Sequence, residues 1–130
     1  KGLPFYKDDW FSKGNAFPTV ENFMVMMHLS EAGIKDPQSI AWLKEKLKRK
    51  GLFGSYSLEG KPLNAVESPA IYAITAIIAR WNGDAELYAL AAGRLKKMQN
   101  LNNNEYYGGF IDLKQLAAFS FDQLLALLAY

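Results

Sequence analysis

Residues Ser68 to Trp81 read SPAIYAITAIIARW, and this stretch decides the fold class. Ser68 is a favourable N-cap residue, and the proline that follows it suits the first position of a helix. The rest of the segment is apolar on most sides, which is typical of a helix buried nearly all round. Asn82 and Gly83 then signal the end of the helix, because glycine tolerates the left-handed conformation that often follows one. The stretch therefore predicts a buried helix.

Amphipathic segments lie on either side of this helix. Asp36 to Lys50 carries apolar residues at the spacing i, i+3, i+7, with lysines and an arginine on the other face. Asp84 to about Gln99 has the same character. Each segment begins with an aspartate, which is a favourable N-cap residue. Both segments predict helices on the surface of the domain.

Two further apolar segments complete the pattern. Val20 to Ala32 is apolar on most faces, and Ser120 to Tyr130 is apolar with Ser120 as its cap. Both predict helices buried nearly all round. The order along the chain is therefore buried, surface, buried, surface, buried.

The connections alternate in length. The links from a buried to a surface helix, at 33–35 and 82–83, are short. The links from a surface to a buried helix span roughly 51–67 and 100–119, which is far longer than most helix connections. All long loops should therefore gather at one end of the domain, beside the N-termini of the buried helices.

The long loops also resemble one another, with similar segments at Gly2 to Tyr6, Gly51 to Tyr56 and Tyr106 to Phe110. Their spacing gives a repeat of about 50 residues, one helical hairpin and one long loop per unit. We predict an all-α fold, a fragment of an α/α toroid with about two and a half hairpins. Its inner helices are buried, its outer helices are amphipathic and its long loops share one face. A linear helical solenoid is the competing architecture.

Two and a half hairpins cannot close a ring. We therefore expect residues 1–130 to form a single domain that is a fragment of a larger (α/α)6 toroid. The apolar inner helices would then be covered by the rest of the toroid or by self-association.

Composition excludes several classes of function. The formal charge of +2 gives no electrostatic case for a nucleic-acid partner. The absence of cysteine excludes thiol catalysis and thiolate metal sites, and a single histidine excludes paired-histidine metal motifs. We therefore predict no metal site and no cofactor.

The end with the long loops is the predicted functional face. N-termini of buried helices bring positive dipole ends together there, and carboxylates amid aromatic rings are typical of a carbohydrate cleft. The alternative is that acidic residues in the first turns of helices only stabilise the helix dipole and take no part in binding or catalysis. Glu67 and Asp122 are the candidate catalytic residues. The candidate sugar-binding residues are Glu21, Asn22, Tyr6, Trp10, Tyr56, Tyr72, Tyr107 and Phe110.

Several of these segments resemble a known family. The run YSLEGKPLNAVESPAIYAI from Tyr56, the loop YGGFID from Tyr107 and the closing SFDQLLALLAY carry the resemblance. ENF at Glu21 and PFY at Pro4 fit the same pattern. Over essentially all 130 residues the chain is similar to the C-terminal half of glycoside hydrolase family 8-like proteins of Gram-positive bacteria.

The resemblance implies a six-hairpin toroid that hydrolyses a polysaccharide with inversion. One carboxylic acid would protonate the leaving oxygen, and one carboxylate would activate water. It also implies that the general acid lies in the other half of the ring, so that the isolated fragment is inactive. An extracellular or cell-surface location follows from the same resemblance.

A rival interpretation is a non-catalytic helical scaffold that binds a protein or peptide on the same face. Its mark would be a cleft lined by aliphatic residues, with the candidate aromatic rings folded inward.

Overall fold

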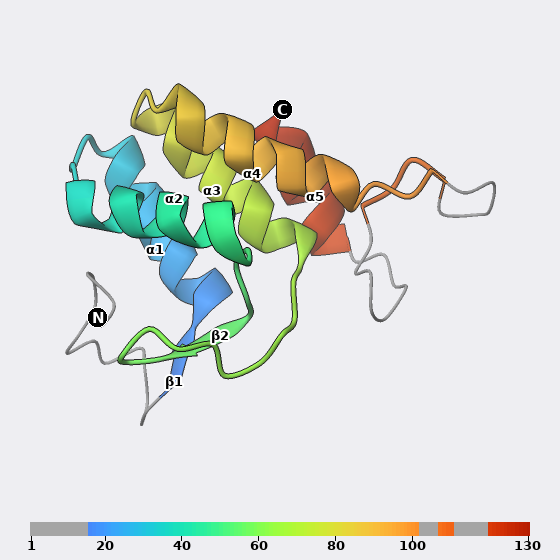
Figure 1. Cartoon of the computed structure of the whole chain (residues 1–130). Coiled ribbons are helices and arrows are strands. Elements are labelled where there is room, and N and C mark those ends of the chain that lie inside the picture. The colour runs from blue at the N-terminus through green and yellow to red at the C-terminus, as the bar shows by residue number, and fades with distance from the viewer. Residues whose placement is uncertain (1–15, 102–106, 111–119) are drawn as a thin grey trace.

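The computed structural model describes residues 16–101, 107–110 and 120–130 (Figure 1). This part of the chain is mostly helical, with one small sheet, and the predicted all-α fold class is confirmed. Each helix lies within two residues of the segment predicted for it. The helices are α1 (Thr19–Glu31), α2 (Pro37–Arg49), α3 (Pro69–Trp81), α4 (Ala85–Lys97) and α5 (Ser120–Ala129).

Helix α3 lies at the centre of the domain. Every residue from Pro69 to Ala79 is buried, as the sequence predicts. Its main packing partners are α4, α5 and α1. Helix α4 covers one side with Leu87, Ala91 and Leu95, and α2 packs against α4 in turn. The predicted alternation of inner and outer helices is therefore confirmed for α3 and α4.

The prediction that α1 is buried nearly all round is wrong. Phe23, Met26 and Met27 are buried, but Leu29 is partly in solvent and the side chain of His28 is 64% exposed. Helix α1 packs against α3 on one side. An apolar composition does not reveal that part of the helix surface stays exposed to solvent.

Helix α5 departs from its prediction in the same way. It packs against α3 through buried Leu125, Ala126 and Ala129. Its other face carries Leu124, Leu127 and Leu128, each more than 60% exposed. The helix is an inner helix on one side and an open apolar surface on the other.

A small antiparallel sheet organises the first long loop. Strand β1 (Ala16–Pro18) pairs with β2 (Ser55–Ser57), and Phe17 lies opposite Tyr56. These strands were not predicted, because three residues are too few to show an alternating pattern. The sheet holds the start of α1 against the loop that follows α2, and the Thr19 N–H reinforces it by donating to Gly54 O at 3.1 Å.

Short turns and long loops lie at opposite ends of the helices (Figure 1). Gly33 and Gly83 follow α1 and α3 with φ of +80° and +65°, so each hairpin turns tightly. The loop after α2 and the segment after α4 lie at the other end, beside the first turn of α3. The predicted gathering of the long loops agrees with this arrangement of the described residues.

We expect Asp84→Asn to lower the free energy of unfolding near neutral pH by up to about 1 kcal/mol. Asp84 caps α4 by accepting the Leu87 N–H at 3.0 Å, and it lies 2.7 Å from Lys44 Nζ. Burial raises the pKa of Asp84, but the hydrogen bond from Leu87 and the interaction with Lys44 outweigh burial, so the pKa is lowered.

A lowered folded pKa stabilises the protein above the unfolded value of about 3.9, and this stabilisation is lost as the pH falls through the folded pKa. Urea unfolding at about pH 7 and about pH 3 should therefore show a smaller acid loss in Asp84→Asn than in the parent. Glu59→Gln, at an exposed acid, is the matched control. Equal acid losses in Asp84→Asn and the parent would contradict the assignment.

Candidate functional site

The first turn of α3 meets the ends of α2 and α4 at the long-loop end of the domain (Figure 1). The Tyr72 hydroxyl accepts a hydrogen bond from the Leu52 N–H at 3.2 Å. Arg94, near the end of α4, donates from Nη2 to Leu47 O at 3.1 Å. These two bonds join three helices and the first long loop at one place.

Three polar side chains surround the backbone at this place, and we call Glu67, Tyr72 and Arg94 the Glu67 cluster. The Tyr72 hydroxyl donates to Glu67 Oε1, and Arg94 Nη1 lies 3.8 Å from the same oxygen. The side chains of Glu67 and Arg94 are 33% and 28% exposed, so solvent reaches both. Tyr72 is buried. A carboxylate has more acceptor positions than these two contacts use, so the cluster can accept a hydrogen bond from a ligand hydroxyl.

Gly51 is required at the centre of this cluster for two reasons. Its φ is +101°, a conformation that side chains with a Cβ rarely adopt. An added Cβ would also lie 2.6 Å from the Tyr72 hydroxyl oxygen and 2.9 Å from Glu67 Oε1. The close approach of this backbone is what allows the three side chains to meet.

Burial raises the pKa of Tyr72, and its hydrogen bond to Glu67 raises it further. The phenol therefore stays protonated well above neutral pH. As a result, Tyr72 remains a hydrogen-bond donor to Glu67 at neutral pH.

The second candidate carboxylate lies at the same end of α3. Asp122, in the first turn of α5, is 5% exposed, and its Oδ1 accepts the Ala70 N–H at 3.1 Å. Ser68 accepts the Ile71 N–H of the same turn at 3.4 Å. Two of the donors that a helix leaves unpaired at its N-terminus are thus satisfied by side chains. Both predicted carboxylates, Glu67 and Asp122, are brought to the N-terminal end of α3.

Three of the four candidate aromatic rings that the structure describes lie inside the protein. Tyr56 and Tyr72 are essentially fully buried, and Phe110 is 7% exposed. Tyr56 packs edge-on against Trp42, with ring centroids 5.3 Å apart. Tyr107 differs, because it is 66% exposed at the second long loop. Among the candidate aromatic residues that the structure describes, only Tyr107 presents its ring to solvent.

The other candidate sugar-binding residues that the structure describes are Glu21 and Asn22, and they also differ in exposure. Glu21 is exposed on the first turn of α1. Asn22 is fully buried, and its Nδ2 donates to Pro18 O at 2.7 Å, which helps to close the start of the helix. Tyr6 and Trp10 lie outside the described residues.

Sequence reasoning missed Arg94. It lies on an amphipathic helix close to Lys96 and Lys97, and the residue types alone give no reason to separate it from them. Only the packing of α4 beside the end of α2 turns its side chain into a bridge.

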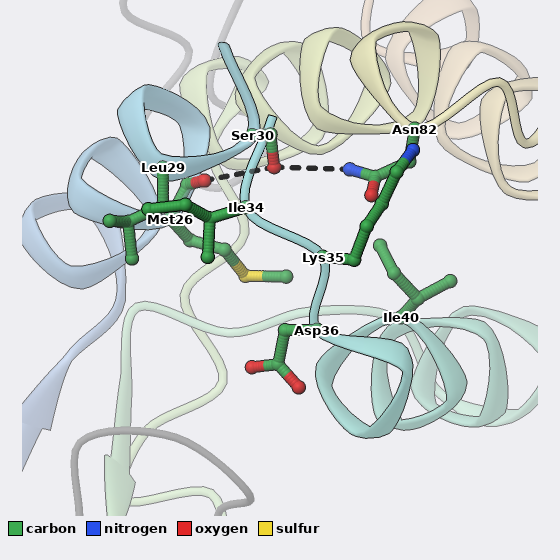
Figure 2. Close-up of a pocket in the computed structure, with 8 residues that line it drawn as sticks. All are labelled: Met26, Leu29, Ser30, Ile34, Lys35, Asp36, Ile40 and Asn82. Carbon is green, nitrogen blue, oxygen red and sulfur yellow. Dashed lines mark hydrogen bonds between the residues drawn. The ribbon is translucent and has the colours of Figure 1, made fainter. Parts of the chain in front are cut away.

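A separate cavity of about 300 Å³ lies at the end of the short turns (Figure 2). We call it the short-turn cavity. Its walls are mainly aliphatic, and the Ser30 hydroxyl donates to Met26 O while accepting from Asn82 Nδ2. The lining residues are Met26, Leu29, Ser30, Ile34, Lys35, Asp36, Ile40 and Asn82.

Within residues 16–101, 107–110 and 120–130, no group of three or more histidine or acidic side chains is placed to hold a metal ion. None of the helices in these ranges has the length and apolar character needed to cross a membrane.

No family model matches the chain, and no curated protein matches it. A solved structure does match, described as a novel alpha-amylase from Clostridium perfringens. It is 37% identical, superposes with a TM-score of 0.82 and covers 91% of this chain. The chain spans only 36% of the length of that structure. The match supports a glycoside hydrolase-type fold, and the more specific likeness to family 8 stays a prediction.

We expect Gly51→Ala to destabilise the protein by about 2–3 kcal/mol, since it adds overpacking to an unfavourable φ. Gly33→Ala is the matched control, because Gly33 has a φ of +80° and open space around its Cβ position. That control should cost only about 1 kcal/mol. Thermal and urea unfolding measure both. Equal losses would show that Gly51 does not hold the Glu67 cluster together.

Proposed function

We propose that this chain is part of a carbohydrate-active enzyme of the glycoside hydrolase type and forms one wall of its glycan cleft. The observation that carries the proposal is the match to an alpha-amylase over 91% of the chain at 37% identity. Since the chain spans about a third of that protein, the complete cleft would need sequence equivalent to the remainder.

Glu67 and Asp122 are the proposed carboxylate pair. Both lie at the N-terminal end of α3, where the helix dipole favours negative charge. An inverting reaction needs one carboxylic acid and one carboxylate, roughly 6.5–9.5 Å apart, with water between the second carboxylate and the sugar. Glu67 is the more accessible of the two, so it is the residue proposed to meet the substrate first. Asp122 also fastens α5 to α3, which gives it a structural duty besides.

The proposed substrate is an α-linked glucan, in keeping with the alpha-amylase to which the chain is similar. Tyr107 is the proposed aromatic contact, because sugar faces stack on exposed rings and this ring is 66% exposed. Glu67 would bind hydroxyls of the same glycan.

A helical scaffold that binds a protein or peptide is the second candidate function. It is favoured by the burial of Tyr56, Tyr72 and Phe110, which removes three rings from the proposed cleft. The aliphatic lining of the short-turn cavity also fits such a partner, although that cavity lies away from the long loops.

The open face of α5 supports a further part of the proposal. Leu124, Leu127 and Leu128 form a contiguous apolar strip, and Trp81 lies exposed at the nearby end of α3. Exposed apolar patches mark surfaces that another element covers. We propose that further helices of a larger ring, or a second copy of the chain, cover this strip.

Saturation-transfer NMR of the chain with maltohexaose and cellohexaose tests the glycan proposal. We expect transfer to maltohexaose and a roughly five- to tenfold weaker affinity in Tyr107→Ala, the range that loss of one stacking ring implies. Trp81→Ala is the control, since it removes an exposed aromatic ring at the opposite end of α3.

Equal weakening by Tyr107→Ala and Trp81→Ala would contradict a cleft at the long-loop end. Absence of transfer from both sugars would show that this wall does not bind a glycan by itself, and the same absence in the full-length protein would favour the scaffold function. Transfer from cellohexaose alone would keep the carbohydrate proposal and replace the α-linked substrate by a β-linked one.

We expect the 130-residue chain to self-associate, with sedimentation velocity giving a mass that rises with concentration. Leu124→Glu/Leu128→Glu should make it monomeric, because the substitutions place charge in the apolar strip of α5. Leu63→Glu, at another exposed leucine, is the control. A parent that stays monomeric at all concentrations would rule out a second copy as the cover.

A further inference from the structure

The basic run of α2 is divided by the helix into two faces. Lys44 and Lys48, four residues apart, face α4. Lys44 Nζ lies 2.7 Å from Asp84 Oδ2 and 3.4 Å from Glu86 Oε2, and Lys48 Nζ lies 2.5 Å from Glu86 Oε1. The charge on this face is therefore balanced by carboxylates of α4.

The other face keeps its charge. Lys46, Arg49 and Lys50 are spaced i, i+3, i+4, so they share a side of the helix end. Arg49 is 3.8 Å from Glu45, but both side chains are more than half exposed, so the pair contributes little. Neither Lys46 nor Lys50 forms an ion pair with any carboxylate in the described ranges of the chain.

These three cations border a cavity of about 210 Å³ between the end of α2 and the first long loop, which we call the basic pocket. It is smaller than the roughly 300–1,000 Å³ of sites for drug-sized ligands, so it suits one sugar unit. The remaining lining residues are Gly51, Phe53, Tyr56 and Pro62.

The aromatic residues that line the basic pocket are Phe53, which is partly exposed, and Tyr56, which is fully buried, so Phe53 is the ring that a ligand can contact. Tyr56 is held edge-on by Trp42, and Lys46 Nζ lies 5.6 Å from the centre of the Trp42 ring. This cation–π contact fixes the ammonium beside the aromatic wall. Cations next to an apolar aromatic surface are the combination that binds a sugar ring carrying negative charge.

We propose that the basic pocket binds a sugar unit with an anionic substituent, a carboxylate or a phosphate. The inference rests on the proposed function, since it takes the chain to bind a glycan, and adds that the glycan is acidic. Gly51 connects the two sites, because it lines the basic pocket and is also surrounded by the Glu67 cluster. An acidic unit in the basic pocket would therefore lie directly beside that cluster.

Amide NMR titrations of the chain with methyl glucuronide, glucose 6-phosphate, methyl glucoside and inorganic phosphate test this. We expect the two anionic sugars to shift the amide signals of Lys50, Gly51 and Phe53. Methyl glucoside should leave these signals in place. Inorganic phosphate should bind at least about fivefold more weakly than glucose 6-phosphate, because it lacks the ring that contacts the aromatic wall.

Lys46→Gln/Arg49→Gln should weaken binding of both anionic sugars at least about tenfold, since it removes two charged contacts. Lys96→Gln/Lys97→Gln is the matched control, because it removes equal charge from exposed positions of α4. The control should change the affinity less than about twofold, and melting curves of both variants verify that they fold.

Equal losses of affinity in the two variants would mean that net charge alone explains the effect, and this result would overturn the inference. Inorganic phosphate binding as tightly as glucose 6-phosphate would mean an adventitious ion only. Maltohexaose that binds in a Tyr107-dependent way, while anionic sugars leave Lys50 and Gly51 unshifted, would retain the proposed function and overturn the basic pocket alone.

Discussion

The structure depends on the burial of α3 on all sides, which requires its polar ends to find partners within the protein. At the N-terminal end, Ser68 and Asp122 accept backbone N–H groups of the first turn. At the other end, Asn82 Nδ2 donates to the Ile78 carbonyl of α3 at 2.9 Å and to the Ser30 hydroxyl of α1 at 3.0 Å. The bonds of Asp122 and Asn82 satisfy α3 and also fasten it to α5 and α1. The same apolar burial that stabilises α3 thus determines where polar groups gather.

Short-range sequence signals were sufficient to predict where helices α2, α3 and α4 begin. Asp36, Ser68 and Asp84 cap their helices as the sequence predicts, because an N-cap acts only on N–H groups a few residues away. The openness of α1 and α5 was not predictable in this way. Leu29 and Leu127 are apolar residues of the kind found in protein cores, yet they are 38% and 71% exposed, and this exposure depends on tertiary packing that local sequence does not encode. The sheet was missed because its pairing joins segments about 40 residues apart in sequence.

The sequence predicted the carboxylates of the candidate site but not the orientation of its aromatic rings or the part played by Arg94. Carboxylates beside helix N-termini follow from the order of helices, and Glu67 and Asp122 each contact a residue in the first turn of α3. Whether an aromatic ring faces inward or outward depends on what the rest of the fold places over it, so Tyr72 and Tyr107 end in opposite environments. Arg94 entered the site through helix packing alone, which leaves no mark in its sequence neighbourhood.

Glu67 has two roles that place opposing demands on its carboxylate. It must hold Tyr72 and Arg94 around Gly51 to keep the first long loop in place, and in the proposed cleft it must also offer an oxygen to a sugar. A rigid scaffold resolves the conflict, because a carboxylate fixed on one oxygen presents the other in a defined direction at little entropic cost. The buried aromatic rings then gain a function without touching a ligand. Tyr56 and Tyr72 provide the firm support against which Glu67 and the basic pocket keep their geometry.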